Sequence, residues 1–120
     1  MSFLHLPVID LEAINNLRSL GDEGDDTFLR EIITIYLEDT PLRIADLKKS
    51  FREEENALFT RSAHTIKGSS ANVGASRVRG IAEQIERRSK AEPIASLAEL
   101  INELDQAYAE AVKDLATYQT

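Results

Sequence analysis

Residues 28–51 read FLREIITIYLEDTPLRIADLKKSF, and apolar side chains recur along this stretch at the spacing of an α-helix. A first apolar group spans residues 28–37 and a second spans residues 42–51, with Thr40 and Pro41 between them. Proline fits the first turn of a helix and bends a helix interior, so this pair predicts either a new helical start or a kink in one long helix. The positions expected to form the apolar face are Phe28, Leu29, Ile32, Ile33, Ile35, Tyr36, Leu37, Leu42, Ile44, Ala45, Leu47 and Phe51.

Three further helical segments follow in the sequence. Asn56 can cap a helix that ends at Gly74, because asparagine suits an N-cap and glycine suits the position after a C-cap. Ser76 restarts the chain, and Pro93 opens the last segment. Their expected inward positions are Leu58, Phe59, Ser62, Ala63, Ile66, Ser70 and Val73, then Val78, Ile81, Ala82 and Ile85, then Ile94, Leu97, Ala98, Ile101, Leu104, Tyr108, Val112 and Leu115.

A short helix is expected ahead of these four. Asp10 is a good N-cap for residues 11–20, Gly21 would stop that helix, and residues 21–26 form a loop. Short connections make sequential helices antiparallel, and no segment alternates with the period of a strand. The sequence therefore predicts an all-α fold: an up-down antiparallel four-helix bundle with a short extra N-terminal helix, in a single domain over residues 1–120.

Composition narrows the classes of function. The chain has no cysteine, which removes disulfides and thiolate metal sites and favours a reducing, cytoplasmic location. It has no apolar run long enough to cross a bilayer and no evident signal peptide, so no membrane role is expected. A net charge of −7 argues against nucleic acid as a partner. We expect a monomer without a bound metal.

The charge is unevenly placed along the chain. Residues 61–90, here called the basic segment, hold seven basic and two acidic side chains, whereas the rest holds seven basic and nineteen acidic ones. Such a segment on an acidic molecule predicts a negatively charged partner, with Arg61 and Arg77 as docking residues. Chance clustering of surface charge explains the same pattern equally well.

The stretch AHTIKGSSANVGA, residues 63–75, carries one of the two histidines. If the apolar positions of this helix face inward, a second group of side chains shares the outward face. That group consists of Arg61, His64, Lys67, Gly68 and Ala71. His64 is then exposed, and Lys67 can hold a positive charge near it. Gly68 costs about 1 kcal/mol relative to alanine within a helix, which suggests that another molecule approaches closely there.

The predicted hairpin brings an acid to this face. With a turn centred near residue 75, position 64 lies opposite position 86 on the next helix. Glu86 is thus a candidate to accept a hydrogen bond from the Nδ1–H group of His64, which would leave Nε2 unprotonated as an outward nucleophile. The alternative is that Glu86 is a solvated charge paired with an arginine.

The stretch 63–75 resembles the signature of histidine-containing phosphotransfer (HPt) domains, where Ala-His, two variable or apolar positions, Lys-Gly, small residues and a final apolar-Gly recur in order. Residues 28–51 are similar to the preceding helical pair of that family, including its acid-small-Pro break. The pair Ile85-Glu86 falls where the family has an apolar residue followed by Glu or Gln. Ile66 in place of leucine is a mild variation. The resemblance covers most of the chain.

This resemblance implies a phosphorelay carrier. His64 would accept a phosphoryl group on Nε2 from the phospho-aspartate of a receiver domain and pass it to another receiver. Lys67 would stabilise the phosphate charge, and Gly68 would admit the partner's loops. The partners implied are response-regulator receiver domains and a hybrid sensor histidine kinase.

The sequence provides little catalytic apparatus of its own. KGSS, residues 67–70, has lysine before glycine, the reverse of a P-loop, and no kinase glycine loop or acid cluster suited to Mg²⁺ is present. We therefore expect no autonomous ATP-dependent activity and no cofactor, with Mg²⁺ only on the partner receiver domain. The alternative is a non-catalytic helical adaptor that docks an acidic partner through the basic segment. The chain is either free-standing or a module of a larger kinase.

Overall fold

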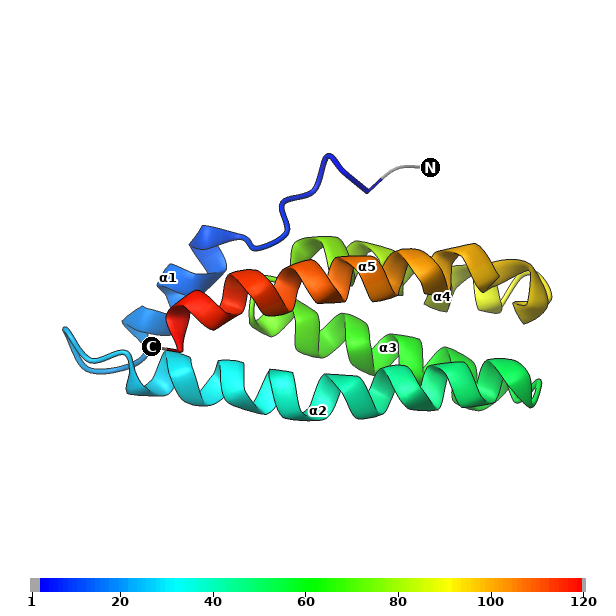
Figure 1. Ribbon diagram of the computed structural model, residues 1–120, viewed down its shortest axis with the longest axis horizontal. Helices are drawn as coiled ribbons and strands as arrows, with labels where there is room; N and C mark the ends of the chain where they lie inside the picture. The colour runs from blue at the N-terminus through cyan, green and yellow to red at the C-terminus, as the bar shows by residue number, and fades with distance from the viewer. Residues whose placement is uncertain (1–2, 120) are drawn as a thin grey trace.

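The computed structural model describes residues 3–119, and helices account for most of them. The elements are α1 (Leu11–Ser19), α2 (Thr27–Arg52), α3 (Asn56–Asn72), α4 (Ser76–Ser89), the 3₁₀ turn η1 (Ile94–Leu97), α5 (Ala98–Leu115) and the 3₁₀ turn η2 (Ala116–Tyr118). The helices α2, α3, α4 and α5 run side by side along the 48 Å long axis, and α1 lies across one end (Figure 1). The predicted all-α bundle with a short extra N-terminal helix is confirmed.

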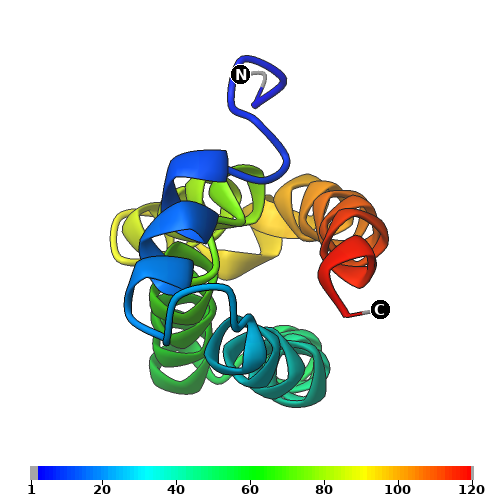
Figure 2. The same ribbon diagram turned by 90° about the vertical axis from the view of Figure 1, so that its left-hand side faces the viewer.

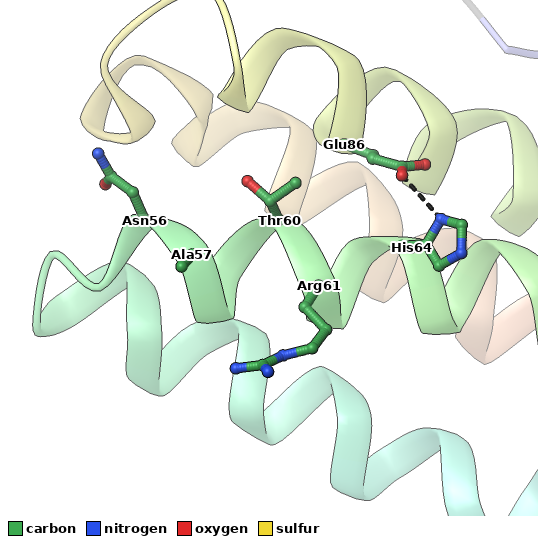
Figure 3. Close-up of a pocket in the computed structure, with 6 residues that line it drawn as sticks. All are labelled: Asn56, Ala57, Thr60, Arg61, His64 and Glu86. Atoms are coloured by element: carbon green, nitrogen blue, oxygen red, sulfur yellow. Dashed lines mark hydrogen bonds and ion pairs between the residues drawn. The ribbon is translucent and has the colours of Figure 1, made fainter.

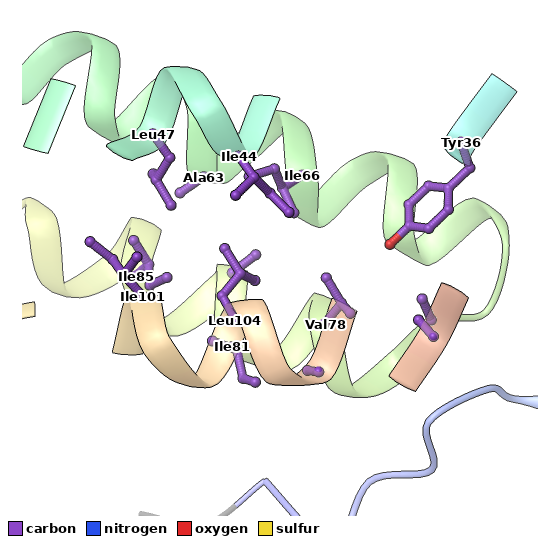
Figure 4. Close-up of a cluster of buried hydrophobic side chains, with 14 of the residues drawn as sticks. Tyr36, Ile44, Leu47, Ala63, Ile66, Val78, Ile81, Ile85, Ile101 and Leu104 are labelled. Carbon is purple, nitrogen blue, oxygen red and sulfur yellow. The ribbon is translucent and has the colours of Figure 1, made fainter. Parts of the chain in front are cut away.

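Seen from its end, the bundle places α3 between α2 and α4 on one side, and α5 between α4 and α2 on the other (Figure 2). Its core is built from aliphatic side chains on the facing sides of all four helices, including Leu47, Ile66, Ile85 and Leu104 (Figure 4). The ion pair between Lys48 and Asp105, at 2.8 Å, joins α2 to α5 on the outer side of the bundle. None of the helices described is long and apolar enough to span a membrane.

The helix α2 passes through Pro41 without a break and is 26 residues long. Of the two alternatives, one long helix is therefore correct, and no new helix starts at Thr40. The proline is exposed, so the backbone bond that it cannot make lies on the solvent side. On the inner side, Tyr36 Oη and Ser70 Oγ form a buried hydrogen bond of 2.8 Å that ties α2 to α3.

Two large apolar residues of α2 were expected in the core and are not there. Ile35 is 60% exposed and Leu42 is 64% exposed. The buried positions Ile33, Tyr36 and Ile44 occupy the inner stripe, and a narrow helical stripe leaves the intervening positions outside. The short side chains expected inward at Ala45 and Ala98 are exposed for the same reason.

The turn after α3 is a Schellman motif. The N–H of Gly74 donates to the carbonyl of Ala71, and the N–H of Ala75 donates to the carbonyl of Ser70. Gly74 has a φ of +73°, and a Cβ atom there would lie 2.9 Å from the carbonyl oxygen of Asp10. The predicted role of Gly74 as the residue after the C-cap is confirmed, and the turn also packs against the start of α1.

The helix starts agree with the predictions to within a few residues. The side chain of Asp10 accepts a hydrogen bond from the N–H of Glu12 at 3.0 Å and so caps α1 as expected. Asn56 is the first residue of α3 rather than its cap, which is Glu55. Pro93 precedes the 3₁₀ turn η1, so α5 begins later than predicted, at Ala98.

Candidate functional site

His64 lies in the middle of α3 with 63% of its side chain exposed. Its Nδ1 atom is 2.7 Å from Oε2 of Glu86 on α4 (Figure 3). An ionised carboxylate only accepts hydrogen bonds, so the imidazole donates from Nδ1, and in the neutral ring Nε2 keeps its lone pair. The predicted contact is confirmed. The alternative, Glu86 as a solvated partner of an arginine, is wrong, because its side chain is 12% exposed and its partners are a histidine and lysines.

The second oxygen of Glu86 binds Lys67. The ammonium of Lys67 is 2.7 Å from Oε1, and the ammonium of Lys90 is 4.0 Å from Oε2. Partial burial alone would raise the pKa of Glu86, but the hydrogen bonds from Lys67 and His64 outweigh it and hold the pKa below its ordinary value. Glu86 is therefore ionised at neutral pH. Its carboxylate joins His64 and Lys67 into one connected cluster.

The register of the α3–α4 hairpin sets this geometry. The Schellman turn at Gly74 reverses the chain, so residues equally far from the turn face each other. About one turn beyond the His64–Glu86 contact, the hydroxyls of Thr60 and Ser89 are 2.6 Å apart. Ser89 also donates to the carbonyl of Glu86 at 2.7 Å. These bonds fix the position of the Glu86 carboxylate along α4.

Small residues leave open space beside the imidazole. Gly68 is exposed, and a Cβ atom built there would meet nothing within 4 Å. Ala71 is exposed one turn further along. The predicted outward face of Gly68 and Ala71 is confirmed, and no packing reason inside the domain accounts for glycine at position 68.

On the other side of His64, an open hollow of about 450 Å³ lies along the start of α3 (Figure 3). Its lining residues are Asn56, Ala57, Thr60, Arg61, His64 and Glu86. Arg61 thus lies on the predicted face, one turn before His64. Ala57 and Thr60 were not predicted as site residues, although their spacing of seven and four from His64 places them on the same side of the helix.

Arg77 does not belong to this site, contrary to the prediction. Its Nη2 donates to the carbonyl of Leu6 at 2.8 Å, and its Nη1 is 2.9 Å from Oε2 of Glu110. Only 17% of its side chain is exposed. Arg77 stands nine residues before Glu86 on α4, which is about 13 Å along the helix axis. Its charge fastens the N-terminal segment to α4 and α5 and is not available to a partner.

The functional groups that converge at His64 are few. Within residues 3–119, no three His, Asp or Glu side chains converge in a way that could hold a metal ion. What the bundle presents is one exposed imidazole with a free nitrogen, one lysine, one carboxylate and an open surface of small residues. These features together are typical of one class of protein, the helical bundles that carry an exposed histidine supported by a carboxylate.

Comparison with known families agrees with that class. The family model described as "Hpt domain" matches residues 31–114, and the chain belongs to this family. It is similar to histidine-containing phosphotransfer protein 5 of Arabidopsis thaliana, with 33% identity over 70 residues, which is 56% of this chain and 45% of that protein. It is also similar to multistep phosphorelay regulator 1 of Schizosaccharomyces pombe, with 29% identity over 79 residues, 66% of this chain and 27% of that protein. The chain thus spans less than half the length of these two relatives.

Solved structures share the fold. Histidine-containing phosphotransfer protein B of Pseudomonas aeruginosa PAO1 matches with a TM-score of 0.85 at 18% identity, over 94% of this chain and 95% of that chain. The histidine-containing phosphotransfer protein MtHPt2 of Medicago truncatula matches with a TM-score of 0.78 at 23% identity, over 93% and 79% respectively.

Proposed function

We propose that this domain is a phosphorelay intermediate in which Nε2 of His64 accepts a phosphoryl group from an aspartyl phosphate and then donates it to a second aspartate. The observation that carries the proposal is the 2.7 Å bond from His64 Nδ1 to Glu86, which directs the free Nε2 to solvent on an exposed helix face. Membership of the Hpt family and the phosphotransfer relatives support the same reaction class.

The reaction requires only a few groups from this chain. The Nε2 lone pair attacks phosphorus, the bond from phosphorus to the aspartyl oxygen breaks, and its electron pair leaves with the carboxylate of the donor. In the second transfer, the carboxylate of a different aspartate attacks phosphorus, the P–N bond breaks, and its electron pair returns to Nε2. Lys67, whose ammonium already lies in this cluster, supplies positive charge to the phosphoryl oxygens.

The surface around His64 fits a protein donor better than a small molecule. Gly68 and Ala71 leave one side of the imidazole flat, and the hollow lined by Ala57 and Arg61 lies on the other side. A receiver domain can therefore bring its aspartate in line with Nε2 without meeting a large side chain. Arg61 adds positive charge at the edge of this contact.

We assign the remaining roles to the partners. The partners are response-regulator receiver domains and a hybrid sensor histidine kinase, and any Mg²⁺ belongs to the receiver domain, where phosphoryl charge must be neutralised. This chain acts as a monomeric phosphocarrier in the cytoplasm, without ATP-dependent activity of its own.

Transfer from a phosphorylated receiver domain tests the proposal. The wild-type protein should take up acid-labile, alkali-stable phosphate, His64→Gln should take up none, and His5→Gln should be labelled like the wild type. His64 is exposed, so its variant should keep the wild-type circular dichroism and melting temperature. Retained labelling of a folded His64→Gln variant would move the acceptor elsewhere. A wild-type protein that binds receivers but takes up no phosphate would be a helical adaptor.

A further inference from the structure

We infer that Glu86 acts on the phosphorylated state: its carboxylate keeps the Nδ1 proton on the phosphorylated imidazole and so primes the P–N bond for onward transfer. This inference rests on the proposed function and adds a step to it. Glu86 is then a positioning residue with two roles: it orients the imidazole of His64, and it holds the Nδ1 proton on that ring.

The electron count explains why that proton matters. A neutral imidazole protonated at Nδ1 becomes cationic when its Nε2 lone pair forms a bond to phosphorus. If the ring keeps the Nδ1 proton, attack by an aspartyl oxygen breaks the P–N bond, returns the electron pair to Nε2 and releases neutral imidazole. If the ring has lost that proton, the same cleavage must expel an imidazolate anion, which is a far poorer leaving group.

The geometry favours retention of the proton on nitrogen. The 2.7 Å separation of Nδ1 and Oε2 is that of a charge-assisted hydrogen bond to an ionised carboxylate, which is about twice as strong as a neutral one. Glu86 is 12% exposed, so water competes poorly for this acceptor oxygen. Lys67 holds the other oxygen at 2.7 Å and helps to keep the pKa of Glu86 low, so the carboxylate does not take the proton itself.

The other charges near His64 reinforce this arrangement. Arg61 and Lys67 lie on α3, Glu86 lies on α4, and Lys90 is the C-cap of α4. Among the residues described, no ion pair or hydrogen bond joins the His64 side chain to α2, the other helix packed against α3. When Lys67 turns to the incoming phosphoryl oxygens, Glu86 loses part of its compensating charge. The carboxylate then carries more uncompensated negative charge beside the ring, which stabilises the cationic, Nδ1-protonated form of the phosphorylated imidazole.

Glutamine at position 86 provides a matched comparison. Its amide oxygen can accept from a protonated Nδ1, and its amide nitrogen can donate to a bare Nδ1, so it tolerates either state of the ring. Glu86→Gln therefore keeps size and hydrogen-bonding capacity and removes the charge. Glu83→Gln, one turn earlier on α4 at an exposed pair with Arg87, is the control for loss of a carboxylate on the same helix.

The test is the pH profile of phosphoryl transfer from each phosphorylated protein to an unphosphorylated receiver, between pH 5 and pH 9. Wild type and Glu86→Gln should transfer at similar rates at pH 5, where the ring is protonated in both. Near pH 8 the Glu86→Gln variant should be about tenfold slower, since it lacks the charge-assisted bond. The ¹⁵N chemical shift of Nδ1 should show the ring of the variant deprotonating at lower pH, and Glu83→Gln should follow the wild type.

Three results would overturn the inference. If phosphorylated wild type and Glu86→Gln give the same pH profile and the same Nδ1 titration, Glu86 does not hold the proton, while the proposed function stands. If the wild type takes up no phosphate from any receiver, the proposed function fails and the inference fails with it. An equal loss of rate at every pH would show that Glu86 only orients the ring.

Discussion

The face of α3 around His64 and the α3–α4 turn with the start of α4 each carry a glycine and a cation, and the two regions use them differently. On the face, Gly68 has open space around it, and Lys67 is part of the cluster at the imidazole. At the turn, Gly74 has a φ of +73° and packs against the start of α1, while Arg77 holds the N-terminal segment. The first pair is free to serve a partner, and the second pair serves the fold.

This difference shows that one sequence motif contains residues of two kinds. Gly68 and Gly74 both belong to the stretch 63–75, yet only Gly74 has a conformation that requires glycine. Arg61 and Arg77 both belong to the basic segment, yet Arg61 is exposed and Arg77 is largely buried. The net charge of the basic segment therefore overstates the charge that a receiver domain meets.

Alanine at the two glycines should give the largest contrast. Gly74→Ala should lower the free energy of unfolding by about 2 kcal/mol or more, because alanine is strained at positive φ and its Cβ atom would press on the carbonyl of Asp10. Gly68→Ala should raise it by up to ~1 kcal/mol, since alanine is the better helix former. Urea denaturation of the two variants and the wild type measures both changes.

Transfer activity should change in the opposite sense at position 68. Gly68→Gln should stay folded but transfer phosphate much more slowly than the wild type, because its side chain fills the space beside His64. Gly68→Ala should show a smaller loss. A Gly68→Gln variant that melts far below the wild type would place this glycine in internal packing, and wild-type transfer by a stable variant would show that close approach is unimportant there.

The two arginines should give a smaller contrast. Arg77→Ala should cost about 1–2 kcal/mol of stability, since it removes the charged donor to the Leu6 carbonyl and the partner of Glu110. Arg61→Ala should change stability by less than about 0.5 kcal/mol, because the residue is exposed. In binding experiments the order should reverse, with Arg61→Ala slowing association with a receiver domain.

Salt provides the control for the arginine comparison. Association of the wild type should weaken as salt rises, because exposed charges are screened beyond about 8 Å at physiological ionic strength. Arg61→Ala should reduce that salt dependence, and Arg77→Ala should leave it unchanged. If Arg77→Ala alters the salt dependence and leaves thermal melting unchanged, the division between the two regions is wrong.

The fold was predictable from sequence because apolar periodicity reports which side of each helix is buried. The inner positions of α3 from Phe59 to Ser70, and its C-cap Val73, were all assigned correctly, and Gly74 marked the end of the helix. The sequence could not show that Ile35 and Leu42 are exposed, because an isoleucine or leucine is the same residue whether its side chain is exposed or buried. The continuity of α2 at Pro41 depends on which side of the helix the proline faces, and the sequence left both alternatives open.

The candidate site was predictable as far as hairpin register determines it. Counting from the turn paired His64 with Glu86, and the spacing of Lys67 and Gly68 placed them beside the imidazole. Counting along the hairpin could not predict which groups the side chain of Arg77 binds. Its partners are the carbonyl of Leu6 and the carboxylate of Glu110, both distant in sequence, and neither has a local signal. Long-range contacts of this kind follow from the assembled bundle.

The most direct measurement of the central claim is the nitrogen-resolved NMR spectrum of the ¹⁵N-histidine-labelled protein before and after phosphorylation by a receiver domain. At rest, His64 should carry its proton on Nδ1, as the bond to Glu86 requires. After transfer, phosphorus should couple to Nε2 of His64, and His5 should be unchanged. Phosphorus on Nδ1, on His5 or on neither histidine would contradict the account of a carboxylate-supported acceptor on the open face of α3.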